Sequence, residues 1–216
     1  MVINLGDTHS LINQFVAEIR DVNIQHDRMR FRRNLERVGE IAAYEISKTL
    51  AWKTKTVTTP LGTKEVPVLA EQPVIGTILR AGLPLHQGLL HYFDGADNAF
   101  ISAYRKHAPD GSFDISLEYL ASASIADKVL IIADPMLATG SSMVKTLLAV
   151  YKEQRPKHTH LVCVIASKPG IELIQRNLTN FTLWTAAIDD TLNDHAYIVP
   201  GLGDAGDLAF GDKIQY

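Results

Sequence analysis

Residues 129–143 read VLIIADPMLATGSSM, and this stretch indicates the fold class most clearly. Its first five residues, VLIIA, form a short apolar run, which is typical of a strand buried on both faces of a parallel sheet. The strand would end at Asp134, and a turn would come after it. The small residues Thr139–Ser142 would then lead into a helix that begins at Met143. The stretch therefore predicts a strand, a loop and a helix in immediate succession, as in an α/β fold.

The predicted loop offers a site for an anion. Backbone N–H groups at a helix start, together with the helix dipole, attract a phosphate, and a glycine such as Gly140 lets it approach closely. Asp134, at the strand end, is placed to hold sugar hydroxyls or a water bound to magnesium. The alternative is an ordinary helix cap made by Ser141 or Ser142 below a strand-end aspartate. The loop is not a P-loop, because no Gly-Lys-Thr or Gly-Lys-Ser comes after it.

Further short apolar runs and helical patterns surround this unit. The runs lie at Val74–Leu79, Ala99–Tyr104, Leu161–Ala166 and Leu183–Ile188, and the helical patterns at Pro84–Phe93, Met143–Gln154 and Ile171–Leu178. Strands that alternate with helices predict βαβ units. We therefore expect an α/β fold with a mostly parallel central sheet flanked by helices.

The chain is expected to form a single domain, residues 1–216, because its length exceeds a typical domain only slightly. Residues 1–70 would hold N-terminal helices and a hairpin excursion. Residues 71–188 would form the α/β core. Residues 189–216 would form a loop-rich C-terminal hood.

Four segments outside the central pattern have patterns of their own. Apolar spacing predicts helices near residues 12–19 and 28–50. Residues 53–70 alternate β-branched and polar side chains, which indicates a hairpin. The alternation around the turn at residues 110–111 predicts a long β-hairpin arm that stands off the sheet.

Charge and composition exclude several classes of protein. The chain has 21 Lys and Arg against 24 Asp and Glu, a net charge of −3, which argues against a protein whose main partner is nucleic acid. Its single cysteine excludes a disulfide framework. No apolar run approaches the roughly 18 residues of a membrane span. The N-terminus shows no signal-peptide pattern, so we expect a cytoplasmic protein without a membrane partner.

Arginines end two of the predicted strands. Arg80 comes directly after Val74–Leu79 in GTILRAGLPL, and Arg105 ends AFISAYR. An arginine buried at such a strand end must meet an anion or a carboxylate, because an unpaired buried charge is costly. A bidentate guanidinium suits a phosphate, and a structural pair with an acidic neighbour is the alternative.

Glycines are dense in the tail, around residues 200–207. Such a segment makes tight turns or lets the backbone approach a flat ligand, although a plain surface loop is the alternative. Acidic residues and a histidine precede it, at Asp189, Asp190, Asp194 and His195. Their spacing matches no defensible ligand pattern, so we expect turn and cap chemistry rather than a metal-dependent hydrolase.

Two other clusters have an ordinary explanation. His158 and His160 with Cys163 resemble half a zinc site, but Cys163 lies in an apolar run and is expected to be a buried structural residue. Five arginines between Arg28 and Arg37 are expected on a solvated helix face. A subunit interface or a site for an effector phosphate is the alternative.

Four stretches resemble the uracil phosphoribosyltransferases, a family of type I phosphoribosyltransferases. They are ILRAG at 78–82, YR at 104–105, DPMLATGSS at 134–142 and IVPGLGDAGD at 198–207. The resemblance implies a type I fold and the synthesis of UMP, in pyrimidine salvage, from uracil and 5-phospho-α-ribosyl 1-diphosphate (PRPP) with release of diphosphate. It also implies Mg²⁺, held mainly by PRPP and water rather than by direct protein ligands.

The resemblance also implies roles for particular residues. Arg80, Asp134 and Asp204 would be catalytic. The residues for PRPP would be Arg80, Arg105, Asp134, Pro135, Met136, Leu137, Ala138, Thr139, Gly140, Ser141, Ser142 and Asp204. The residues for uracil would be Ile198, Gly203, Asp204 and Ala205.

The chain departs from the family pattern at two places. Ser141 stands where the family loop has a second glycine. The arm at Lys106–Ser124 does not match the acidic, proline-containing run of the family, so no role is carried over to it.

The resemblance implies a homodimer or a larger homo-oligomer, and GTP is a candidate effector because it activates some members. Two other functions stay open at this point. One is a regulator with a phosphoribosyltransferase-like fold that senses nucleotides and binds RNA. The other is the same chemistry on another base.

Overall fold

The computed structural model describes residues 1–107 and 113–213, with side chains outside 103–118. Its centre is an eight-stranded sheet with the order β1-β10-β9-β7-β4-β5-β6, and the short strand β8 pairs with β9. All pairings are parallel except β5 with β6. The strands are β1 (Val2–Asn4), β4 (Val74–Leu79), β5 (Asp97–His107), β6 (Phe113–Ser122), β7 (Val129–Ala133), β8 (Met136–Leu137), β9 (His158–Ser167) and β10 (Phe181–Asp189). The predicted mostly parallel α/β sheet is confirmed.

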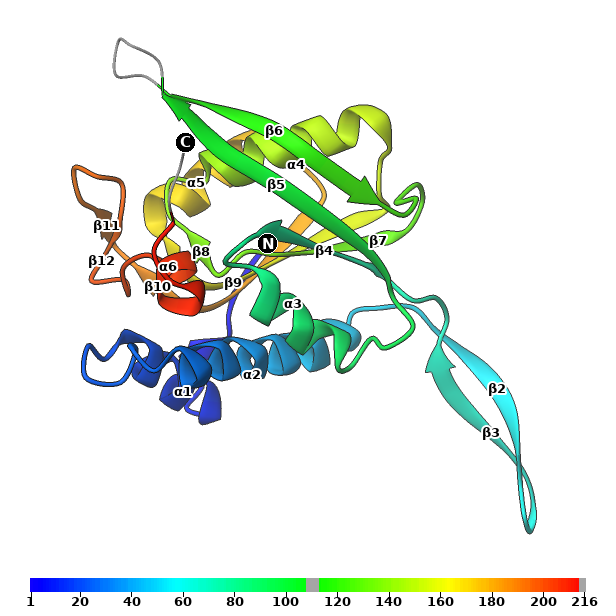
Figure 1. Cartoon of the computed structure of the whole chain (residues 1–216). Coiled ribbons are helices and arrows are strands. Elements are labelled where there is room, and N and C mark those ends of the chain that lie inside the picture. Colours follow the sequence, from blue (N-terminus) through cyan, green and yellow to red (C-terminus); the bar gives the residue numbers. More distant parts are fainter. Residues whose placement is uncertain (108–112, 214–216) are drawn as a thin grey trace.

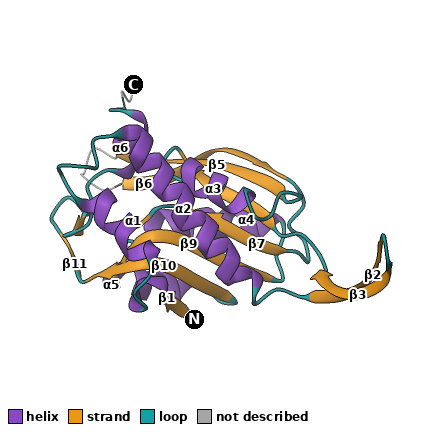
Figure 2. Ribbon diagram, turned by 90° about the horizontal axis from the view of Figure 1, so that it is seen from below, coloured by secondary structure: helices purple, strands orange, loops and turns teal. Residues whose placement is uncertain are grey.

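Helices cover both faces of the sheet (Figure 1). Those on one face are α1 (Leu11–Arg20), α2 (Arg28–Ser47) and α3 (Leu83–Leu90), and those on the other are α4 (Ser141–Glu153) and α5 (Lys168–Asn177). Successive residues of β7 alternate between the two cores, with Ile131 facing α1–α3 and Ile132 facing α4 and α5. This burial on both faces explains why the strand reads as a continuous apolar run. Figure 2 shows α2 lying across the sheet.

Two hairpins extend from this body. Strands β2 (Trp52–Thr59) and β3 (Gly62–Leu69) pair only with each other and project away from the sheet, as the predicted excursion requires (Figure 1). The second hairpin, β5–β6, confirms the pairing of the predicted arm. It does not stand off the sheet along its whole length, because Asp97–Ser102 also pair with β4. Residues 108–112 lie outside the described part of the chain.

The tail contains more regular structure than the glycine pattern indicated. Strands β11 (Thr191–Leu192) and β12 (Ile198–Val199) form a small antiparallel ladder. The helix α6 (Ala205–Phe210) comes next, so the predicted loop-rich hood also contains a short helix and a short ladder. This helix packs beside α2, where Arg32 Nη1 donates to the carbonyl of Ala209 at 2.7 Å. Within the described residues, no helix has the length and apolar character needed to cross a membrane.

Candidate active site

The centre of the sheet brings two strand ends together. β4 lies between β5 on one side and β7 on the other, so the strand order reverses there. Thr77 of β4 pairs in register with Ala133 of β7, and the two strands run parallel. Ligands of open α/β sheets bind at the carboxyl ends of strands at such a switch point. Arg80 and Asp134 come directly after these two ends.

The loop after β7 is held by hydrogen bonds between its backbone and β9. Strand β8 pairs Met136 with Ile165 of β9, and Ser167 Oγ donates to the carbonyl of Ala138 at 2.6 Å. Gly140 has a φ of +77°, and a Cβ there would lie 2.9 Å from the carbonyl oxygen of Gly170. Only glycine meets both conditions without strain. The glycine was placed correctly from the sequence, whereas β8, which is two residues long, was missed.

The start of α4 is not an ordinary serine cap. The helix begins at Ser141, and its N-cap is Gly140, which has no side chain. The backbone N–H of Ser141 donates to Thr139 Oγ1 at 3.2 Å. A cap made by Ser141 or Ser142 was therefore wrong, and both serines lie inside the first turn. The Ser141 N–H is thus occupied by Thr139, whereas Ser142 lies in the first turn, where a helix leaves N–H groups without intrahelical partners, which suits an anion.

Asp134 has an unusual electrostatic setting. Its carboxyl accepts a long hydrogen bond, 3.4 Å, from the backbone N–H of Met136. Burial raises the pKa of Asp134 to about 7, and the Met136 hydrogen bond offsets this only in part. Within the described residues no cation pairs with it. A carboxyl group of this kind can hold hydroxyl groups in either protonation state.

Arg80 is less buried than its position after a strand indicated. Its side chain is 42% exposed, so the expectation of a deeply buried arginine was wrong. Its Nη2 lies 3.2 Å from Asp207 Oδ1 and 3.4 Å from the carbonyl oxygen of Gly211. An acidic partner is therefore present, and the guanidinium remains accessible to a ligand.

The turn after Arg80 is tight. A Cβ at Gly82 would lie 2.3 Å from Thr77 Oγ1 and 2.6 Å from the carbonyl oxygen of Ala133. Only glycine therefore fits between the ends of β4 and β7. This close approach brings the start of α3 against both strands.

The hood presents a backbone turn at Gly203. This residue has a φ of +96°, and a Cβ there would meet no atom within 4 Å. Asp204 caps α6, because its Oδ1 accepts from the N–H groups of Gly206 at 2.8 Å and Asp207 at 3.0 Å. Ile198 and Ala205 are buried beneath the turn. The structure thus groups the four residues expected to contact uracil around one turn.

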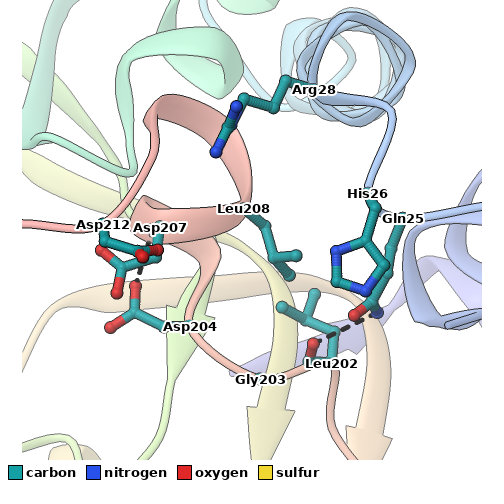
Figure 3. Close-up of a pocket in the computed structure, with 9 residues that line it drawn as sticks. All are labelled: Gln25, His26, Arg28, Leu202, Gly203, Asp204, Asp207, Leu208 and Asp212. Carbon is teal, nitrogen blue, oxygen red and sulfur yellow. Dashed lines mark hydrogen bonds between the residues drawn. The ribbon is translucent and has the colours of Figure 1, made fainter.

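A cleft of about 250 Å³ borders this turn from the side of the α1–α2 loop (Figure 3). Its lining residues are Gln25, His26, Arg28, Leu202, Gly203, Asp204, Asp207, Leu208 and Asp212. The cleft combines cationic and acidic side chains from two distant parts of the chain. No local sequence pattern indicates that Asp207 contacts Arg80, because the two residues lie 127 positions apart.

The remaining candidates fall into structural roles. The Asp189 carboxylate accepts hydrogen bonds from both terminal nitrogens of Arg20, each at 2.8 Å, and from the N–H of Gly201 at 2.9 Å. Asp190 forms an ion pair with Lys168. Asp189 and Asp190 therefore form ion pairs rather than the expected turn and cap contacts, and among these described candidates a turn contact is present only at His195, whose N–H donates to Asn193 Oδ1 at 3.0 Å. Within the described residues, no group of three or more histidine, cysteine or acidic side chains could hold a metal ion.

The histidine–cysteine cluster and the arginine cluster of the sequence also lie in the described structure. Cys163 is buried, and burial raises the pKa of its thiol to about 12. His160 accepts from Trp184 Nε1 at 3.0 Å, so it is a packed core residue. Arg30 and Arg33 of α2 are exposed and pair with glutamates, as the predicted solvated face requires. Arg32 and Arg37 are half-buried instead, and they donate to the carbonyl of Ala209 and to Asn34 Oδ1. The backbone of Arg105 lies in β5, opposite Ile115, but its side chain lies outside the described part.

The switch point, the turn at Arg80 and the glycine-bearing loop before α4 are features of a type I phosphoribosyltransferase. The solved structure of the AQ2163 protein from Aquifex aeolicus matches with a TM-score of 0.87 and 29% identity, covering 100% of both chains. An orotate phosphoribosyltransferase of Mycobacterium tuberculosis, solved in complex with PRPP, has a TM-score of 0.52 at 12% identity. That match covers 84% of this chain and 92% of the other, and it is a likeness of fold alone.

The family is more specific than the fold. The family model described as uracil phosphoribosyltransferase matches residues 7–212. A uracil phosphoribosyltransferase of Porphyromonas gingivalis is 58% identical over 214 residues, which cover 99% of both chains. One from Thermococcus kodakarensis is 40% identical over 208 residues, covering 95% of this chain and 89% of the other. The chain belongs to the uracil phosphoribosyltransferase family, which is a family of enzymes.

Proposed function

We propose that the chain transfers the 5-phosphoribosyl group from PRPP to uracil, giving UMP and diphosphate. The observation that supports this most directly is the convergence of three segments. The turn at Arg80 and the loop Asp134–Ser142 leave adjacent strands, and the hood reaches the first of them through Asp207. This arrangement would bind the leaving diphosphate, the 5′-phosphate and the nucleobase next to one another.

Arg80 is assigned to the leaving diphosphate. Displacement at the ribose C1 places negative charge on that group as the bond to C1 breaks. An exposed guanidinium at the strand end can form two parallel hydrogen bonds to it. The backbone at Ala81 and Gly82 would add donors. Electrostatic stabilisation of this kind is usually the largest catalytic contribution.

The loop after β7 is assigned to the rest of PRPP. Residues Thr139–Ser142 would hold the 5′-phosphate at the N-terminus of α4, where the Ser141 N–H donates to Thr139 Oγ1. Asp134 would hold the ribose hydroxyls. Binding energy at the phosphate would then keep C1 close to the attacking nitrogen. Pro135–Ala138 connect these two contacts.

The hood is assigned to uracil. Ile198, Gly203 and Ala205 surround a turn with few polar side chains, so its backbone would recognise the base. Uracil presents an acceptor, a donor and an acceptor along O2, N3–H and O4, which suits a backbone that supplies N–H, C=O and N–H. Asp204 would lie between uracil and PRPP. The β5–β6 arm, which carries Arg105, would exclude water from the site.

The chemistry of these residues fits Mg²⁺ held through the substrate. Asp134 and Asp204 offer oxygen atoms, which this cation prefers, but they do not form a cluster of direct ligands. When bound to PRPP, Mg²⁺ would neutralise part of the charge on the diphosphate. Asp134 and Asp204 would contact waters of its coordination shell. We also propose a cytoplasmic homo-oligomer, with GTP as a candidate effector.

UMP formation from uracil and PRPP, with and without Mg²⁺, tests this proposal. We expect turnover only with all three components present. A panel of bases tests the alternative of another substrate, and cytosine is the sharpest member. It reverses the donor and acceptor at two positions, and each buried mismatch costs about 1–3 kcal/mol. Equal kcat/KM for uracil and cytosine would contradict the assignment of the hood.

An RNA-binding regulator is the second candidate. Such a regulator would need a basic face, whereas Arg30 and Arg33 of α2 form ion pairs with nearby glutamates. RNA retained in a filter-binding assay, without UMP formation, would favour it.

A further inference from the structure

Asp207 contacts the guanidinium that is assigned to the diphosphate. Its Oδ1 accepts from Arg80 Nη2 at 3.2 Å, and the carbonyl of Gly211 accepts from the same nitrogen at 3.4 Å. Asp207 is the third residue of α6, and Asp204 Oδ1 accepts its backbone N–H. Two points of the hood, 127 and 131 residues further along the chain, thus hold the arginine that comes after β4.

We propose that Asp207 is a positioning residue that holds the Arg80 guanidinium against the hood and releases it to the diphosphate of PRPP. The carboxylate and the diphosphate would compete for one cation. This inference rests on the proposed function, because it takes Arg80 as the ligand of the diphosphate.

The exposure of the pair makes such an exchange feasible. The side chains of Arg80 and Asp207 are 42% and 30% exposed, and an ion pair this open to water is weak. Both contacts to the hood use Nη2 alone, so they form a single point of attachment. A diphosphate carries more charge and can accept two parallel hydrogen bonds from a guanidinium. It therefore displaces a single carboxylate oxygen.

The exchange also connects the two substrate subsites. α6 begins at Ala205, directly after Gly203 and Asp204, which are assigned to the base. A Cβ at Gly206 would lie 3.9 Å from both Ala81 Cβ and Arg80 Nη2, so this helix start lies against the turn after β4. Arrival of the diphosphate removes the ion pair between these segments. Asp207 thus links the binding of diphosphate at Arg80 to the contact between the hood, which is assigned to uracil, and the turn after β4.

Calorimetric titration of the full chain with inorganic diphosphate tests the competition. Asp207→Asn keeps the shape of the side chain and removes its charge. We expect the Kd of diphosphate to fall about two- to fivefold in low salt, since an exposed ion pair is lost from the free state. The gain shrinks in high salt, which screens exposed charges.

Asp212→Asn is the matched control. Asp212 lines the same cleft, and the structure gives it no contact with Arg80 within the described residues. It removes the same charge, so we expect a smaller gain than from Asp207→Asn. The decisive arm is the double variant with Arg80→Ala, in which Asp207→Asn should give no more than the small gain of Asp212→Asn. A purely structural role of Asp207 would not depend on Arg80 in this way.

The outcomes separate this inference from the proposed function. Unchanged or weaker binding in Asp207→Asn overturns it, and so does an equal gain in the Arg80→Ala background. If Arg80→Ala weakens diphosphate binding while Asp207→Asn does not tighten it, the inference alone falls. If Arg80→Ala leaves diphosphate binding unchanged, both the role of Arg80 and the inference are wrong.

Discussion

The neighbouring strands β4 and β7 end at the same edge of the sheet, but they lead into segments that are built differently. The loop after β7 is held by pairing of β8 with β9 and by close backbone contact between Gly140 and Gly170. The turn after β4 begins with Arg80, whose side chain is exposed and attached to the hood by a weak ion pair. A rigid backbone cradle thus lies beside a movable cation. This difference suits a substrate with one phosphate that stays on the product and a diphosphate that leaves.

Arg80→Ala breaks the movable side of this comparison and has the largest expected effect. A lost charge-assisted contact to the leaving group costs about 2–4 kcal/mol, or roughly 30- to 1000-fold in rate. Folding should be unaffected, because the side chain is exposed and its ion pair is weak. Steady-state kinetics measure the loss of rate, and thermal unfolding checks that the stability is unchanged. Near-normal turnover would remove Arg80 from the mechanism.

Gly140→Ala breaks the rigid side instead. The new Cβ would lie 2.9 Å from the carbonyl oxygen of Gly170 in a left-handed backbone conformation. We expect a loss of about 1–3 kcal/mol in the free energy of unfolding, together with a higher KM for PRPP. Gly203→Ala is the matched control, because its φ is also positive but its Cβ would meet open space. An equal loss of unfolding free energy in the two variants would show that the contact with Gly170 does not contribute to stability.

Asp134→Asn tests the electrostatics of the rigid side. The folded-state pKa of Asp134, about 7, lies above its ordinary value of 3.8, so the folded chain binds this proton more tightly than the unfolded chain does. The stability that this group contributes is present in full below about pH 4 and is lost as the pH rises through about 7. The variant should lose activity, yet at about pH 8 it should be more stable than the wild type by about 1 kcal/mol or more.

Chemical denaturation across the same pH range measures this gain. It should fade as the pH drops toward about 4, where both states of the wild type are protonated. A gain of constant size at every pH would show that Asp134 is not the titrating group.

Ser141→Gly has the smallest expected effect. It restores the usual glycine of the family loop, and backbone N–H groups at a helix start bind phosphate whichever residue carries them. The KM for PRPP should stay within about twofold. A rise beyond roughly tenfold, about 1.4 kcal/mol, would mean that the serine hydroxyl holds the phosphate.

The two strand ends also show how far a sequence can predict such a site. The bounds of β4 and β7 agree with the predicted runs, because each is a short apolar segment that ends at a charged residue. The position of Gly140 in a loop before a helix could be predicted, because small residues ahead of a helix form a local pattern. The exposure of Arg80 and its contact with Asp207 could not be predicted, since they depend on how the hood folds back from the far end of the chain.

Short elements were missed for a related reason. The three residues of β1 form a strand only because β10 offers them an edge. The six residues of α6 come after a glycine-rich turn and depend on the Asp204 cap and on packing beside α2. Their stability comes from tertiary contacts rather than from a local pattern.

We propose that the turn after β4 and the loop after β7 bind opposite ends of one PRPP molecule. The most direct measurement titrates the wild type, Arg80→Ala and Gly140→Ala with inorganic diphosphate and, separately, with ribose 5-phosphate. We expect Arg80→Ala to weaken the binding of diphosphate and to spare ribose 5-phosphate, while Gly140→Ala does the reverse. Equal weakening of both ligands in both variants would contradict the claim.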